Sequence, residues 1–260
     1  MKIALGIEYD GSPWHGWQSQ PDGLTVQDQL ETALSRFADA PIRVHCAGRT
    51  DTGVHALGQV VHLETDRQRE AHAWVRGVNA YLPASIAVRW AQPVAEGFHA
   101  RFSATRRSYE YWVYNHPVRS ALYVQRAGWT HVPLDVALMQ QAARTLLGTH
   151  DFSAFRSSEC QAKSPVRNLQ QLELERFGDL IRLRLSADAF LHHMVRNIVG
   201  TLIYVGNGRQ PVAWVKDILD GRNRTLAAPT FSPAGLYLTQ VEYPQHFGIP
   251  VNPAASFFCP

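Results

Sequence analysis

The sequence of 260 residues contains few cysteines, and the three that it has, Cys46, Cys160 and Cys259, lie far apart. No two of them form a Cys-x-x-Cys pair, so the sequence indicates neither a disulfide framework nor a thiolate zinc site. We expect all three thiols to be reduced. His192 and His193 are adjacent, whereas two metal ligands on a helix typically stand four residues apart. The remaining histidines are scattered, which predicts a protein without a bound metal.

Long apolar runs are also missing from the sequence. No stretch approaches the roughly 18 consecutive apolar residues of a membrane-spanning helix, and the chain reaches Glu8 and Asp10 too early for a signal peptide. With 45% hydrophobic residues it can still bury a substantial core, which predicts a soluble, cytoplasmic protein. The net charge of +3 is compatible with an anionic partner but is too small to identify one.

The first hundred residues have the periodicities of alternating strands and helices. Residues 2–9 alternate between apolar and polar or small side chains, as in a strand with one buried face. Thr25 with Asp28 resembles a capping box, and apolar residues then recur at helical spacing up to Ala40. The other elements predicted here are strands at 42–47 and 57–64, a helix at 71–82 and a strand at 86–92. Their order, β-α-β-β-α-β, is that of a split βαβ unit.

The second half of the chain repeats this order without residue-level similarity. Its predicted elements are a strand at 108–115, a helix at 135–147, strands at 169–176 and 180–186, helices at 190–205 and 212–219, and a strand at 235–242. We therefore predict an α+β fold of two ferredoxin-like halves, residues 1–104 and 105–245. A proline-rich tail at 246–260 follows, either as a strand-capping extension or as a frayed end.

A polar loop with repeated glycines joins two apolar strands within residues 46–61. Arg49 and Asp51 stand two residues apart in this loop and could pair or face a common substrate. The glycines, which allow a tight turn or a close approach to a ligand, are Gly48, Gly53 and Gly58. Loops of this composition often hold functional sites. The alternative is an ordinary turn with a surface Arg–Asp pair.

The tripeptide Asp51-Thr52-Gly53 also matches the signature of aspartic proteases. Those enzymes need two carboxylates that share a proton, supplied by a second copy of the tripeptide or by a symmetric dimer. The sequence holds no second copy, and a nearby Arg49 would keep the Asp51 carboxylate ionised. A hydrolase is therefore the weaker interpretation.

The segment Ala47-Gly48-Arg49-Thr50-Asp51-Thr52-Gly53-Val54-His55-Ala56 resembles the catalytic motif of the tRNA pseudouridine synthase A family. Further motifs follow in the family's order. They are Tyr9-Asp10-Gly11-Ser12 with His15-Gly16-Trp17-Gln18, Phe98-His99-Ala100-Arg101-Phe102-Ser103-Ala104, His193-Met194-Val195-Arg196-Asn197-Ile198-Val199-Gly200, and Gly235-Leu236-Tyr237-Leu238. The resemblance runs from about residue 3 to residue 243.

This resemblance implies an isomerase that converts uridine to pseudouridine at positions 38, 39 and 40 of the tRNA anticodon stem-loop. The reaction involves no redox change and no net hydrolysis, so no cofactor is expected. The resemblance also implies that the two halves form one continuous antiparallel sheet with a central catalytic cleft, and that the enzyme is a homodimer whose two subunits both contact tRNA. The main alternative is a non-catalytic RNA-binding protein on the same fold, which could dispense with Asp51.

The resemblance assigns roles to four residues. Asp51 is the catalytic carboxylate, which could attack C1′, add to C6 of uracil or remove a proton from C2′. Arg196 would pair with it and keep it ionised, unless this arginine instead caps nearby carbonyls. Tyr109 would bind the target uracil and assist proton removal from C5, while Tyr111 is structural. Arg49 would fill the gap left by flipping the target base out of the stem.

RNA contact is predicted chiefly at a segment that is both basic and aromatic. Its residues, which the resemblance also implicates, are Phe98, His99, Ala100, Arg101 and Phe102. The alternative is a solvated charged turn. Lys163, in the segment 159–163, and Arg69, in the charged run 66–70, are further candidates for phosphate contact.

Overall fold

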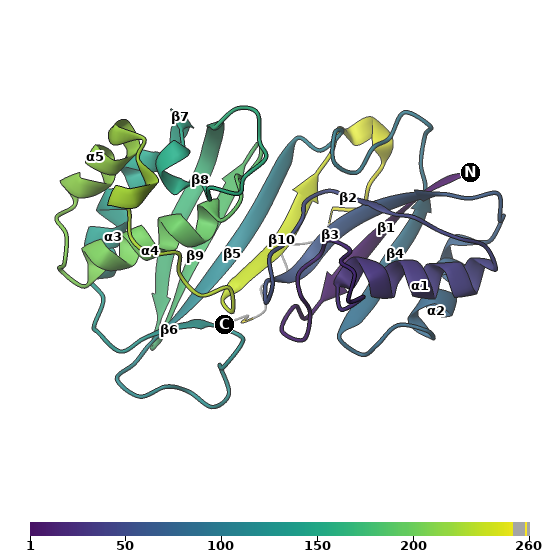
Figure 1. The fold of residues 1–260 in the computed structure, drawn as a ribbon, viewed down its shortest axis with the longest axis horizontal. Helices are drawn as coiled ribbons and strands as arrows, with labels where there is room; N and C mark the ends of the chain where they lie inside the picture. Colours follow the sequence, from purple (N-terminus) through teal and green to yellow (C-terminus); the bar gives the residue numbers. More distant parts are fainter. Residues whose placement is uncertain (252–257, 259–260) are drawn as a thin grey trace. The chain divides into compact units, whose positions relative to one another are not determined.

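The computed structural model describes residues 1–251 and residue 258, and the chain divides into two compact units (Figure 1). Unit 1 contains residues 1–105 together with residues 237–251, and unit 2 contains residues 106–236. The boundary predicted between residues 104 and 105 lies one residue before the boundary in the structure, which falls between residues 105 and 106. The last strand, which we predicted in the second half, belongs almost entirely to unit 1. Cys259 and most of the predicted tail lie outside the described residues.

Unit 1 is built around a mixed sheet. Its elements are β1 (Lys2–Tyr9), α1 (Val26–Ala38), β2 (His45–Cys46), β3 (His55–Glu64), α2 (Ala71–Asn79), β4 (Ile86–Pro93), β10 (Leu236–Glu242) and the 3-10 turn η4 (Gln245–Phe247). Strands β4, β1 and β3 pair antiparallel in that order, and β2 and β10 both pair with β3. Because β10 runs parallel to β3, pairing Tyr237 with His55, the prediction of a purely antiparallel sheet is wrong.

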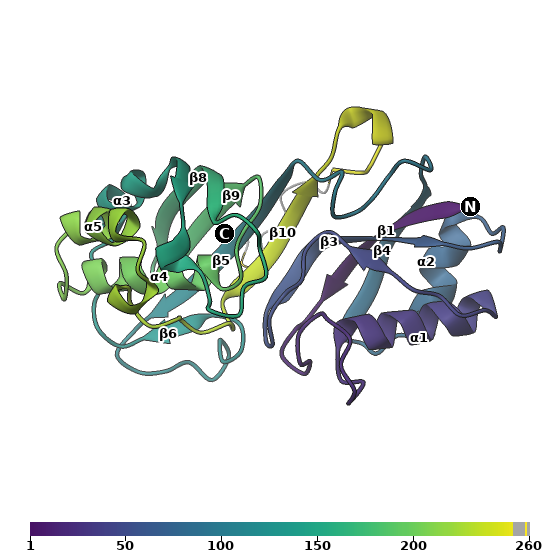
Figure 2. The same cartoon turned by 45° about the horizontal axis from the view of Figure 1, so that its top comes forward.

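The first helix forms where its capping pattern predicts. The Thr25 side chain accepts a hydrogen bond from the Asp28 amide at 3.2 Å, and the helix ends at Asp39, which adopts a left-handed conformation. Val26, Leu30 and other apolar residues of one face are fully buried. Helix α1 packs against α2, and α2 packs against β4 (Figure 2).

Strand β1 departs from its predicted pattern because the middle of its second face, at Ala4 and Gly6, is buried as well. Ala4 is as fully buried as Leu5. A Cβ at Gly6 would lie 2.0 Å from the Trp90 indole nitrogen, so this indole lies directly over the glycine and covers the second face. Position 6 thus accepts no side chain.

Unit 2 holds the remaining strands and three α-helices. Its elements are β5 (Arg106–Asn115), β6 (Gly128–Thr130), α3 (Val136–Ala143), η1 (Arg144–Leu146), β7 (Gly148–Asp151), η2 (Ser153–Phe155), β8 (Val166–Phe177), β9 (Leu180–Ala187), α4 (Met194–Gly206), α5 (Ala213–Gly221) and η3 (Arg224–Leu226). Strands β5, β9, β8 and β7 are antiparallel in that order, and β6 pairs parallel with β5. Helix α3 packs against α4, α5 and β8. The whole chain is thus α+β, with mixed strand pairing in both units.

Two local elements differ from the sequence prediction for identifiable reasons. The strand predicted at 42–47 is reduced to β2, because side chains of α1 accept hydrogen bonds from backbone amides near the start of that segment. The Ile42 amide donates to the Ser35 hydroxyl at 2.9 Å and the Val44 amide to the Glu31 carboxylate at 3.0 Å. The helix predicted from Phe190 begins at Met194, since His193 has a left-handed φ of 64°. The short strands β6 and β7 were not predicted.

None of the helices in residues 1–251 is both long and apolar enough to span a membrane.

Candidate active site

The loop between β2 and β3 carries Asp51 and is anchored to the end of β1 and the loop after it. The Trp17 amide donates to the Thr50 carbonyl at 3.0 Å, and the Tyr9 hydroxyl shares a buried hydrogen bond of 2.8 Å with Thr50 Oγ1. The Val54 amide closes a turn on the Asp51 carbonyl at 3.1 Å. The backbone immediately before and after Asp51 is therefore held from both sides.

Glycines allow the Asp51 loop to touch the loop that follows β1. A Cβ at Gly11 would lie 1.9 Å from the Val54 carbonyl oxygen, and one at Gly16 would lie 2.9 Å from the Thr50 carbonyl oxygen. Gly16 also has a φ of +88°, which side chains rarely permit. The motifs around residues 9–12 and 15–18 thus support the Asp51 loop by close backbone contact.

His55, the first residue of β3, is buried and contacts the loop after β1. Its Nδ1 accepts the Gly11 amide at 3.1 Å, and its ring stacks on Tyr237 with 4.6 Å between centroids. Asp10 Oδ1 also lies 3.1 Å from this nitrogen. The same Asp10 oxygen accepts hydrogen bonds from the amide and the hydroxyl of Ser12.

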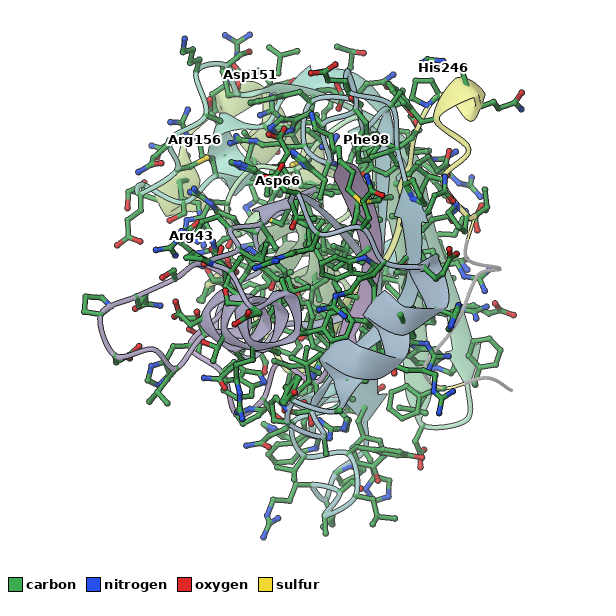
Figure 3. All side chains as sticks on the ribbon, turned by 90° about the vertical axis from the view of Figure 1, so that its right-hand side faces the viewer. Arg43, Asp66, Phe98, Asp151, Arg156 and His246 are labelled. Carbon is green, nitrogen blue, oxygen red and sulfur yellow. The ribbon has the colours of Figure 1, made fainter. Side chains whose placement is uncertain are left out.

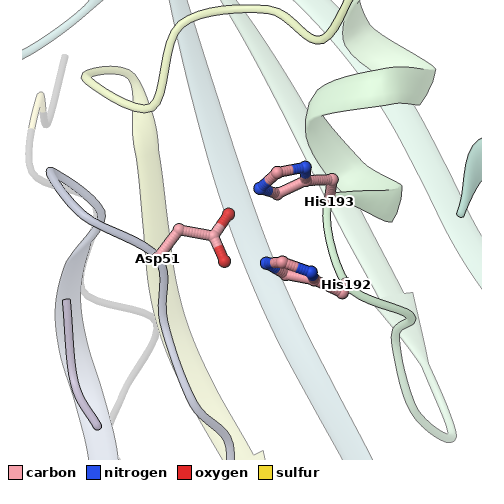
Figure 4. Close-up of side chains that lie close together, drawn as sticks. All are labelled: Asp51, His192 and His193. Atoms are coloured by element: carbon pink, nitrogen blue, oxygen red, sulfur yellow. The ribbon is translucent and has the colours of Figure 1, made fainter. Parts of the chain in front are cut away.

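Asp51 itself is half-buried, whereas Arg49 is exposed. The Asp51 carboxylate extends from the loop before β3, and Figure 4 also shows the imidazoles of His192 and His193 directly before α4. Within either unit taken alone, the described residues include no group of three His, Cys, Asp or Glu side chains close enough to hold a metal ion.

In unit 2, Tyr109 lies on β5 opposite Leu185 of β9 and is 9% exposed. Its ring meets that of Phe190 edge-on, with 5.0 Å between centroids. Tyr111, which the sequence predicts to be structural, is fully buried and donates its hydroxyl proton to the Ser232 carbonyl at 2.7 Å.

Arg196 lies in the first turn of α4 and is half-buried. Its Nε donates to the Phe231 carbonyl at 2.9 Å, while the Phe231 amide donates to the Arg196 carbonyl at 3.3 Å. The carbonyl contact that we weighed as an alternative role is therefore present.

The predicted RNA-binding segment divides into buried and exposed side chains. Phe98, labelled in Figure 3, and Ala100 are fully buried, so their side chains cannot reach RNA in this conformation. Arg101 is exposed and Phe102 is 76% exposed. His99 lies between these extremes, with its ring centroid 4.3 Å from that of Phe102.

The two further candidates for phosphate contact are both exposed. Lys163 lies in the loop that precedes β8, where Arg156 donates to the Cys160 carbonyl at 2.6 Å. Arg69 places its guanidinium 4.6 Å from the centre of the Phe37 ring.

Comparison with known proteins identifies the family. The sequence model of a family described as tRNA pseudouridine synthase matches residues 6–103 and 142–244. The tRNA pseudouridine synthase A of Paraburkholderia phymatum is 58% identical over 255 residues, which cover 98% of this chain and 96% of that protein. The chain belongs to the tRNA pseudouridine synthase A family.

A second sequence relative and a solved structure also match this chain. The tRNA pseudouridine synthase A of Burkholderia lata is also 58% identical, over 96% of this chain and 93% of that protein. A solved structure of a Cbf5–Nop10–Gar1 complex covers 86% of this chain and 60% of that chain, but its TM-score of 0.34 and 13% identity add nothing to the assignment. Membership in the tRNA pseudouridine synthase A family makes the chain an intramolecular isomerase and removes the aspartic protease interpretation.

In this member of the tRNA pseudouridine synthase A family, several residues support the Asp51 loop without having been predicted to do so. Tyr9, Gly11 and Gly16 lie in motifs named above, and each contacts the Asp51 loop directly. The glycines were a usable signal. The contact between Gly11 and His55 had none, because the two residues stand 44 positions apart in the sequence.

Proposed function

We propose that this chain converts uridine to pseudouridine at positions 38, 39 and 40 of the tRNA anticodon stem-loop. It acts in the cytoplasm, as a homodimer and without a cofactor. The observation that carries the proposal is the segment of residues 47–56, which resembles the family's catalytic motif and whose backbone is fixed around Asp51. The identity of 58% over 98% of the chain supports it.

The proposed reaction rearranges bonds within one nucleotide. The C1′–N1 bond breaks, the uracil turns while it is held, and C1′ joins C5. The C5 proton leaves and N1 gains a proton, so no oxidant, reductant or net water is needed. Asp51 supplies the carboxylate, and attack on C1′, addition to C6 and removal of the C2′ proton all remain open as its step.

Three further residues complete the proposed chemistry. Tyr109 binds the uracil and assists removal of the C5 proton. Arg196 keeps the Asp51 carboxylate ionised and oriented. Arg49, whose side chain is exposed, takes the place of the flipped base in the stem. These roles require residues of both units to act on one nucleotide, in keeping with the predicted pair of ferredoxin-like halves, continuous sheet and central cleft.

RNA binding is proposed for the exposed side chains among the predicted RNA contacts. Arg101 and Lys163 can neutralise phosphates, and Phe102 can stack on a base. Arg69 is a further phosphate contact. The buried Phe98 and Ala100 then contribute by shaping the segment, and His99 through its contact with Phe102.

The test is incubation of the purified protein with an unmodified anticodon stem-loop transcript, followed by carbodiimide mapping of pseudouridine. We expect product on the 3′ side of the arm with the natural protein, and none with Asp51→Ala or Asp51→Asn. Asp66→Ala, which changes an exposed carboxylate outside the loop, serves as the control and should retain activity. Because Asn keeps the shape but loses the charge, Asp51→Asn should still bind tRNA. Binding without any product from the natural protein would favour the non-catalytic alternative.

A further inference from the structure

Two histidine side chains bind three successive backbone amides of a turn in unit 1, residues 98–103. The Ala100 amide donates to Nδ1 of His62 at 3.1 Å. The amides of Arg101 and Phe102 donate to Nδ1 of His99 at 3.1 and 3.3 Å. An imidazole nitrogen that accepts a hydrogen bond carries no proton, so this turn needs both histidines in the neutral form.

His62 reaches the turn from the sheet. It lies on β3 and is 3% exposed, with its ring 5.0 Å from that of His45 and 4.6 Å from that of His99. The Ala100 peptide group is also held from its other side, because the Tyr243 hydroxyl donates to the Ala100 carbonyl at 2.7 Å. The turn is therefore fixed by long-range side-chain contacts and not by its own sequence alone.

The surrounding charges favour neutral imidazoles. Burial, together with His99, His45 and Lys2, lowers the pKa of His62 to about 4, and Glu64 opposes this shift weakly. Burial also lowers the pKa of His99, with His45 and Lys2 acting in the same direction. Lys2 lies on β1 and donates to the Phe98 carbonyl at 3.2 Å, so its charge is part of the turn's surroundings. At neutral pH both histidines are available as acceptors.

The turn presents two exposed side chains beside each other. The Arg101 guanidinium lies 5.5 Å from the centre of the Phe102 ring, and that ring leans on His99. We propose that His62 is a positioning residue for tRNA binding, because its bond to the Ala100 amide fixes the turn that offers these two side chains to RNA. The inference rests on the proposed function, in which Arg101 and Phe102 contact tRNA.

The first experiment compares two substitutions of His62 in steady-state assays with tRNA transcripts. His62→Leu removes the acceptor, so KM and the dissociation constant for tRNA should rise about three- to tenfold while kcat stays unchanged. His62→Asn, whose side-chain oxygen can accept the same amide, should restore most of the affinity. The control is Val78→Ala, which removes buried volume from α2 and should destabilise unit 1 without changing KM. If Val78→Ala raises KM as much, or if His62→Leu lowers kcat alone, the proposal is overturned.

The second experiment is a double-mutant cycle. Phe102→Ala should weaken tRNA binding in the natural protein and have a clearly smaller effect in the His62→Leu background, because the ring is no longer held in place there. Equal effects in both backgrounds would contradict the proposal. Should His62→Leu fail to fold, Tyr243→Phe releases the same Ala100 peptide from its other side and takes its place in the cycle.

These variants distinguish the RNA contact from the positioning role of His62. If Arg101→Ala and Phe102→Ala leave tRNA affinity unchanged, the proposed RNA contact and the role of His62 both fall. If those variants weaken binding but His62→Leu and Tyr243→Phe do not, the RNA contact stands and the positioning role of His62 alone is overturned.

Discussion

The hydroxyl of Tyr9, the last residue of β1, shares a buried hydrogen bond of 2.8 Å with Thr50, the residue directly before Asp51. This contact joins β1 to the loop that carries Asp51, the proposed catalytic carboxylate. A group on the sheet therefore sets the position of the peptide that precedes Asp51.

Tyr9→Phe should lower kcat severalfold with little change in KM for tRNA. The change keeps the ring and leaves Thr50 Oγ1 without this partner, at a cost of about 1 to 2 kcal/mol in the free energy of unfolding. Steady-state kinetics and urea unfolding measure the two effects. Tyr111→Phe loses a partly buried hydroxyl contact of similar length in unit 2, and as the control it should cost stability without lowering kcat as far. An equal loss of kcat in both variants would argue against a specific role for Tyr9.

Gly16→Ala should reduce kcat at least tenfold, because the new Cβ would press on the Thr50 carbonyl and displace the Asp51 loop. The matched control is Gly178→Ala. Gly178 also has a positive φ, of 58°, but a Cβ there meets nothing within 4 Å. Both variants place alanine at a positive φ, which strains the backbone by about 1 kcal/mol. Only Gly16→Ala also brings the new Cβ against the Thr50 carbonyl. Similar activities in the two variants would show that the close approach has no consequence for catalysis.

Arg101→Ala should weaken tRNA binding and reduce the slope of log affinity against log salt concentration by about 0.7 to 0.9, the values for one lost phosphate contact on single strands and on duplex DNA. Binding titrations at several salt concentrations give the slope directly. Arg89→Ala, which removes an exposed arginine on β4 beside Glu8, is the control and should leave the slope unchanged. A normal slope for Arg101→Ala would remove this residue from the RNA contacts.

The stability of the protein should decrease as the pH falls from about 6.5 towards 4. The pKa of His62 is about 4 in the folded chain against an ordinary value of 6.5, so the unfolded chain binds this proton more readily. The contribution of neutral His62 is complete above pH 6.5 and is lost as the pH falls through the folded pKa, up to about 3 kcal/mol. Urea unfolding of the natural protein and His62→Asn at pH 7.5, 6 and 5 measures it. The free energy of unfolding of His62→Asn should fall less steeply with decreasing pH than that of the natural protein. An equal decrease in both proteins would contradict the prediction.

Much of the fold of unit 1 could be predicted because its signals are local. The capping pair of Thr25 and Asp28 and the apolar spacing after it lie within or next to one helix, and the position of β1 follows from period-2 alternation. The short strands β6 and β7 carry too few residues for a periodic signal. The parallel pairing of β10 with β3 joins residues about 180 positions apart, and no local pattern contains that information.

The candidate site likewise has a part that local sequence signals indicate and a part that depends on contacts between distant residues. Asp51 stood out because its loop is polar and rich in glycine, and the family's motif gave it a role. The contacts that hold the site are tertiary. The Nδ1 of His62 meets an amide 38 residues away, and Tyr9 meets a threonine 41 residues away, so these histidine and tyrosine side chains read in the sequence as ordinary strand residues.

The placement of β10 has a consequence for how the protein is made. Unit 1 includes β10, which follows unit 2 in the sequence. When residues 1–105 have left the ribosome, β3 can pair with β1 and β2, but its third partner, β10, has not yet been synthesised. Until β10 emerges, the part of β3 around Ala56 and Gly58, which β10 contacts in the finished protein, is an unpaired strand edge of the kind that invites association with other chains. Unit 1 therefore completes its folding only after synthesis of unit 2, and a gene divided between the two units at residue 105 would yield a first fragment without its last strand.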